Sequence, residues 1–190
     1  MSARAQVSSS LRRCGAVSAV AIGLIAAGCA TPPQPPAVVA PSVATVASET
    51  AFDRSIADIR AQLDLLRETG VDVPVPADAG GGYTHEQHKQ NGKTIYDAGM
   101  LYRITGERAY LDFAAELLDA YADLYPTLDL HPKVNPERPS RLFWQGLNEA
   151  VWLVYVSQGY DAIRDDLAGE QRAKFETQLI RPMADFLSEG

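Results

Sequence analysis

The amino-acid sequence predicts an all-α fold. Apolar residues recur at three- and four-residue steps in the long segments after residue 49, and no stretch alternates apolar and polar residues as a strand would. Short turns containing glycine or proline separate these segments, which favours consecutive helices packed as hairpins. The chain has 190 residues, of which 46% are hydrophobic and 22% charged, as in an ordinary globular domain.

Residues 1–28 are expected to be a secretion signal of the lipoprotein type. A basic leader with three arginines precedes an uncharged run of small apolar residues that is too short to span a bilayer. The small residues ending at Gly28 resemble a lipoprotein cleavage box, which makes Cys29 the expected lipidated residue. Plain cleavage nearby and an uncleaved anchor are the alternatives. With a lipid attached, the protein would be periplasmic or anchored to the outer membrane.

Residues 29–49 are predicted to form a linker, because Pro, Ala, Val and Thr favour extended polyproline conformations there. The net charge is −7, and loss of the three leader arginines makes it more negative still. This balance argues against nucleic acid as a partner and requires any anionic ligand to bind where basic residues concentrate. The two cysteines, Cys14 and Cys29, leave no disulfide or cysteine metal site in the mature chain.

Residues 50–190 form the predicted folded part. Its first helix runs from Glu49 to Thr69, with Gly70 as the C-terminal cap. The three glycines at 80–82 are interpreted as a turn, with a mobile lid as the alternative. A capping box of Thr84 and Gln87 is expected to open the second helix.

The second helix is expected to end at Thr105, and the third to run from Arg108 to Tyr125, where Pro126 ends it. The short turn between them predicts an αα-hairpin. His85 and His88 lie in the first turn of the second helix, where the helix dipole lowers histidine pKa values, so we expect both to be neutral near pH 7. Their spacing would suit a metal, but no third ligand follows, and we expect no metal or cofactor.

Residues 126–139 form the longest irregular segment between helices. Four prolines stiffen it, and it carries His131, Lys133 and Arg138 just before Arg141. This is the most basic patch of an acidic chain. A rigid basic loop of this kind is what a binding site for an anionic ligand needs.

The segment Arg141–Ile163, with Ser140 as its cap, is predicted to be a helix enclosed by other helices, because apolar residues occupy nearly every angular position. Gln145, Asn148 and Glu149 share one face of this helix. Burying such groups without partners costs about 1–3 kcal/mol for an amide and more for a carboxylate. The row is therefore either a polar network between helices or a ligand-binding surface.

A last helix is predicted from Gln171 to Leu187, with a kink or break at Pro182. Helical hairpins with aromatic inner faces indicate an α/α barrel or toroid, and about five helices are too few to close the ring. We therefore expect a partial toroid, continued beyond Gly190 in a longer protein.

Four motifs of the folded part are distinctive: Tyr83–Lys89, Ile104–Gly106, Tyr125–Pro132 and Arg141–Glu149. Through these motifs the sequence resembles the N-terminal toroid of oligoalginate lyases, from about Phe52 onward. The resemblance implies an incomplete toroid followed by a heparinase II/III-like β-domain. It also implies β-elimination of mannuronate- or guluronate-containing oligosaccharides, with alginate as the anionic partner.

Removal of the weakly acidic uronate C5 proton needs a neutralised carboxylate, a base near C5 and an acid for the leaving oxygen. In the family an Asn-His pair neutralises the carboxylate and two tyrosines act as base and acid. These motifs are expected downstream of Gly190, so the resemblance transfers no catalytic residue to this chain.

The resemblance does imply residues that bind substrate. Glu149 is expected to pair with Arg141 or with a histidine and hold it in place. The complete set of expected substrate-binding residues is Lys133, Arg141, Gln145, Asn148, Glu149, His85 and His88.

Two other functions are weighed against the lyase. A non-catalytic helical-repeat module of the cell envelope would show self-similarity at about 34 residues, which the sequence lacks. A glycoside hydrolase of the toroid type needs two inward carboxylic acids, and Glu149 is the single candidate.

Overall fold

A computed structural model describes residues 49–189 of the chain. The predicted signal, Cys29 and all of the predicted linker except Glu49 lie outside these residues. Helices, turns and loops make up the described part, which contains no strand, and this confirms the all-α prediction. The toroid stays a prediction. No helix between residues 49 and 189 is both long enough and apolar enough to cross a membrane.

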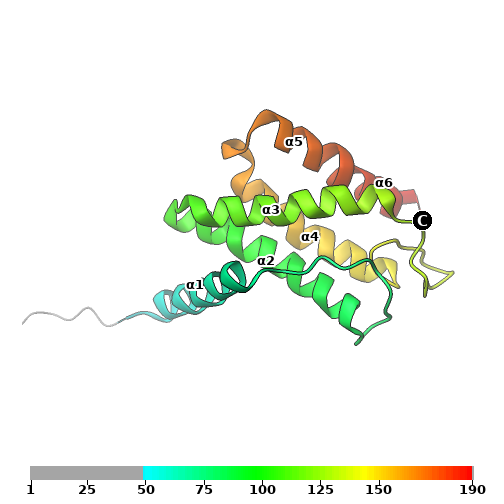
Figure 1. The fold of residues 1–190 in the computed structure, drawn as a ribbon, viewed down its shortest axis with the longest axis horizontal. Coiled ribbons are helices and arrows are strands. Elements are labelled where there is room, and N and C mark those ends of the chain that lie inside the picture. Colours follow the sequence, from blue (N-terminus) through cyan, green and yellow to red (C-terminus); the bar gives the residue numbers. More distant parts are fainter. Residues whose placement is uncertain (1–48, 190) are drawn as a thin grey trace, which may run out of the picture. The chain divides into compact units, whose positions relative to one another are not determined.

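Six α-helices follow one another along the described part of the chain, with three short helical turns between them (Figure 1). The α-helices are α1 Ala51–Thr69, α2 Tyr83–Thr105, α3 Arg108–Leu124, α4 Gly146–Ile163, α5 Gly169–Phe175 and α6 Arg181–Glu189. The turns are η1 Tyr125–Thr127, η2 Arg164–Asp166 and the π-helical η3 Glu176–Ile180.

Capping interactions set the ends of the first helix, and Gly70 caps its C-terminus as predicted, with its N–H donating to Leu66 O at 2.9 Å. Thr50 opens α1 with a capping box, since the Asp53 N–H donates to its hydroxyl at 3.1 Å and its own N–H donates to the Asp53 carboxylate at 2.9 Å. The capping box predicted at Thr84 is wrong. The N-cap of α2 is Gly82, two residues earlier, so that α2 begins at Tyr83, and the Thr84 hydroxyl instead accepts the N–H of Asp78 at 2.9 Å.

A left-handed glycine and one close approach between two helix backbones determine the position of α2. Gly106 adopts a left-handed conformation (φ 72°) and its N–H donates to Tyr102 O at 2.7 Å, which reverses the chain into α3 and confirms the predicted αα-hairpin. Gly99 and Gly159 let α2 and α4 touch, because a Cβ atom on Gly99 would lie 2.4 Å from the Gly159 oxygen. Residues 80–82 form a turn, as interpreted from the sequence.

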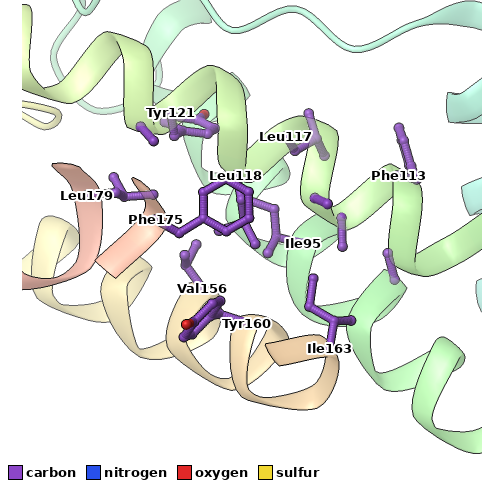
Figure 2. Close-up of a cluster of buried hydrophobic side chains, with 14 of the residues drawn as sticks. Ile95, Phe113, Leu117, Leu118, Tyr121, Val156, Tyr160, Ile163, Phe175 and Leu179 are labelled. Carbon is purple, nitrogen blue, oxygen red and sulfur yellow. The ribbon is translucent and has the colours of Figure 1, made fainter. Parts of the chain in front are cut away.

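The hydrophobic core lies between α2, α3, α4 and the C-terminal helical run. Figure 2 shows Phe175 reaching toward Leu118 of α3, with Ile95 of α2 and Val156 of α4 close by, and each of the four is fully buried. The run from α5 to α6 is interrupted by the π-helical turn just before Pro182, which agrees with the predicted kink or break.

α4 is less enclosed than the sequence predicts. Four of its apolar side chains stay 43–60% exposed: Leu147, Val151, Val154 and Tyr155. An apolar stripe of this length on one helix is a candidate contact surface, and it borders the site described next.

Candidate functional site

The Glu149 carboxylate is buried at the start of α4 and organises the segment before it. Its Oε2 atom accepts the backbone N–H groups of Arg141 at 2.8 Å, Leu142 at 2.9 Å and Phe143 at 3.4 Å. Its Oε1 atom accepts the Tyr125 hydroxyl at 3.0 Å. Burial raises the pKa of this carboxyl above its usual value, and the four donors oppose that shift by stabilising the ionised form.

This arrangement corrects the predicted start of the central helix. α4 begins at Gly146, and Gln145 is its N-cap with extended backbone (φ −138°), so Gln145 does not share a helix face with Asn148 and Glu149. Glu149 is 0% exposed and bonds the Arg141 backbone rather than its side chain or a histidine. Of the two interpretations of the polar row, Glu149 fits the internal network.

Residues 128–145, which we call the basic loop, are held by backbone hydrogen bonds between their two halves. The His131 N–H donates to Ser140 O at 2.9 Å, and the Asn135 N–H donates to Trp144 O at 2.9 Å. Ser140 is buried and its hydroxyl donates to Phe143 O, so it braces the loop instead of capping α4 as predicted. The loop is therefore an ordered element, as its prolines indicated.

The cationic side chains of the basic loop have no acidic partner within residues 49–189. Lys133 and Arg138 are exposed and Arg141 is half-buried, and none of the three forms an ion pair there. The Arg141 guanidinium lies 4.8 Å from the centre of the Phe186 ring and 5.9 Å from that of Tyr125. Arg138 and Arg141 line separate shallow grooves, so these two do not converge on one cleft.

His85 and His88 lie beneath the basic loop. His88 is 0% exposed, its Nδ1 lies 2.8 Å from the Tyr121 hydroxyl, and burial lowers its pKa to about 4. His85 packs edge-on against Phe143 and is 5% exposed, and burial likewise lowers its pKa. Both are thus neutral near pH 7 as expected, although desolvation rather than the helix dipole is the main cause. Neither side chain opens to solvent. In residues 49–189 no cluster of three metal-ligating side chains is present.

Asn148 lines a groove between α2 and α4 that sequence reasoning did not identify. The groove has a volume of about 360 Å³, and we call it the α2–α4 groove. Its lining residues are Glu86, Lys89, Gln90, Lys93, Asn148, Val151, Trp152 and Tyr155. Positions 86, 89, 90 and 93 share one face of a helix, and 148, 151, 152 and 155 share another, so helical spacing could have grouped each set.

Comparison with known proteins shows which proteins this chain is similar to. A protein named exo-oligoalginate lyase from Saccharophagus degradans is 57% identical over 129 residues, which is 68% of this chain and 18% of that protein. A protein named alginate lyase from Stenotrophomonas maltophilia is 53% identical over 136 residues, or 72% of this chain and 18% of that protein. The chain is similar to alginate lyases. This confirms the resemblance seen in the motifs.

The chain spans about 18% of the length of the two alginate lyases that it matches. No family model matches the sequence. The segment shared with the alginate lyases is thus a small part of each of those proteins.

Replacing Glu149 with glutamine should lower the free energy of unfolding by about 3 kcal/mol, because an amide nitrogen would then face backbone donors in a buried site. Urea unfolding followed by circular dichroism measures this change. Glu137→Gln is the matched control, since Glu137 is exposed on the same loop and its carboxylate forms no hydrogen bond or ion pair within residues 49–189. Equal stability of both variants would contradict the assigned role of Glu149.

Stability should fall as pH drops from about 6.5 to about 4. Over this range the unfolded chain protonates His88 at its ordinary pKa of 6.5, whereas the folded chain does so only near its pKa of about 4. The loss approaches about 3 kcal/mol at the lower limit, and stability is insensitive to this group above pH 7. His85, His131 and Asp72 act on the same ring, and Asp72 favours its protonation.

Urea unfolding at a series of pH values tests this, with His88→Gln as the comparison. The variant should show a shallower decline below pH 6.5. If wild type and variant have parallel pH profiles, His88 is not the titrating group.

Proposed function

We propose that this chain supplies a helical, substrate-binding part of an alginate lyase, which cleaves alginate oligosaccharides by β-elimination. The observation that carries the proposal is identity above 50% with two alginate lyases over about 70% of the chain. The ordered basic loop supports it, because it concentrates Lys133, Arg138 and Arg141, none of which forms an ion pair within residues 49–189, in a chain of net charge −7.

In this proposal the basic loop binds uronate carboxylates. Arg141 offers a planar guanidinium that can hold a carboxylate through two hydrogen bonds, and Lys133 offers an exposed ammonium. Gln145 and Asn148 add amide groups for sugar hydroxyls. Glu149, His85 and His88 are buried, so we give them the task of holding the basic loop and α2 in place rather than touching the sugar.

β-Elimination also needs a base near C5, an acid for the leaving oxygen and a group that neutralises the uronate carboxylate. We assign none of these roles to residues 49–189. Tyr121 and Tyr125 are fully buried, and burial raises the pKa of each hydroxyl, so neither is suited to receive a proton from a sugar.

Activity is tested with the full-length protein and alginate oligosaccharides, by following ultraviolet absorbance of the unsaturated uronate product. Lys133→Ala and Arg141→Ala should each raise KM about tenfold, since a charge-assisted hydrogen bond contributes about 1.5–3 kcal/mol. Arg103→Ala is the matched control, because Arg103 is exposed near the C-terminal end of α2 and does not belong to the basic loop. Absence of any unsaturated product would favour a non-catalytic helical-repeat module of the cell envelope.

We also propose that Cys29 is lipidated and that the protein is a periplasmic or outer-membrane-anchored lipoprotein. The basic leader, the uncharged apolar run and the small residues before Cys29 support this. In the native host, mass spectrometry should find a diacylglyceryl group on Cys29, and Cys29→Ser should move the protein from the membrane to the soluble fraction. An unmodified Cys29 in membrane-bound protein would overturn the anchor.

A further inference from the structure

The basic loop contains the same four-residue turn twice in succession. We call residues 131–134 the first turn and residues 135–138 the second turn. Each has proline at its second position, and the N–H of its fourth residue donates to the C=O of its first residue, at 2.9 Å in the first turn and 3.0 Å in the second. The two turns therefore share one backbone hydrogen-bonding pattern.

A side chain closes each turn by accepting the N–H group of the third residue. In the second turn the acceptor is the side-chain oxygen of Asn135, to which the Glu137 N–H donates at 3.0 Å. In the first turn it is the imidazole Nδ1 of His131, to which the Lys133 N–H donates at 3.1 Å. Asparagine often closes a turn in this way and does not titrate, whereas histidine gains a proton in mild acid. Of the two turns, the first is thus closed by a titratable group.

The hydrogen bond from Lys133 fixes the tautomer of the His131 ring. Because Nδ1 accepts this bond, the neutral ring carries its proton on Nε2. A second proton has to occupy Nδ1, where it meets the Lys133 N–H, and two donors form no hydrogen bond with each other. A protonated His131 is therefore incompatible with the closed first turn.

The surroundings of His131 keep its ring neutral at pH 7. The residue is 2% exposed, and burial lowers its pKa below the ordinary value of 6.5. His85 of α2 and Lys133 of the turn lower this pKa further, whereas the charge of Asp78 and a hydrogen bond with its backbone oppose the shift. His88 of α2 also interacts with the His131 charge. Together these groups keep the first turn closed near neutral pH.

We propose that His131 is a positioning residue for Lys133, and that proton uptake at its Nδ1 in mild acid releases the first turn. Lys133 is exposed and forms no ion pair within residues 49–189, so the turn determines where its ammonium group lies. The consequence for catalysis rests on the proposed function, in which Lys133 binds a uronate carboxylate. Release of the turn then weakens substrate binding and leaves the chemical step unchanged.

Amide hydrogen exchange in the full-length protein tests the turn itself. Rates for single amides are measured by mass spectrometry at about pH 7.5 and about pH 4.5, and each is compared with the rate of an unstructured chain at that pH. The protection of the Lys133 amide should fall about tenfold at the lower pH, because its hydrogen bond is lost. The Glu137 amide is the internal control and should keep its protection. Equal changes at both amides, or none at either, would overturn the proposal.

Two substitutions exchange the acceptors of the two turns. His131→Asn should keep the first turn closed by a group that does not titrate, so that the Lys133 amide loses no protection in acid. Asn135→His should transfer the acid sensitivity to the second turn, so that the Glu137 amide loses about tenfold. If His131→Asn still loses Lys133 protection in acid, another group titrates and the assignment of His131 is wrong.

Kinetics with alginate oligosaccharides test the consequence for Lys133. Between about pH 7.5 and about pH 4.5, KM of the wild-type protein should rise about three- to tenfold more than KM of His131→Asn, while kcat follows one pH profile in both. Loss of folded protein alone would lower kcat and leave KM unchanged. If KM of the two proteins changes in parallel, the positioning role is wrong and the proposed function stands. If the exchange results agree but no unsaturated product forms, the turn is confirmed and the proposed function fails.

Discussion

A buried carboxylate that must find donors is the constraint from which the site follows. Glu149 lies where α4 packs on the rest of the core, and an unpartnered charge there would be strongly destabilising. The chain satisfies it with three successive backbone N–H groups and one tyrosine hydroxyl. Those N–H groups cannot also take part in a helix, so the backbone before α4 turns away and becomes the end of the basic loop.

The position of the basic loop follows from that connection. Its two halves are tied by backbone hydrogen bonds, and its inner side packs on His85 and His88 of α2. Arg141, which donates its own N–H to Glu149, sends its guanidinium over Phe186 of α6. A single acidic side chain thereby links α4 to the loop that carries Lys133, Arg138 and Arg141, and the loop in turn contacts α2 and α6.

Sequence reasoning located most helix ends, because local signals decide them. Gly70, Gly106 and Pro126 each mark a change in backbone conformation that depends on one residue. Sequence reasoning failed at Thr84 and at the start of α4, because hydrogen bonds to distant residues decide the local backbone structure at those two positions. Thr84 bonds Asp78 in the preceding loop, and Glu149 captures N–H groups six to eight residues earlier. The α2–α4 groove was missed for a similar reason, since pairing its two faces requires knowledge of which helices touch.

Hydrogen exchange of the unmodified protein tests the central claim most directly. If the Glu149 carboxylate holds the end of the basic loop, the amides of Arg141 and Leu142 will exchange as slowly as amides inside α4, although neither residue is helical. If they exchange as fast as an exposed loop amide such as that of Leu130, the carboxylate does not hold the loop and this account of the site is wrong.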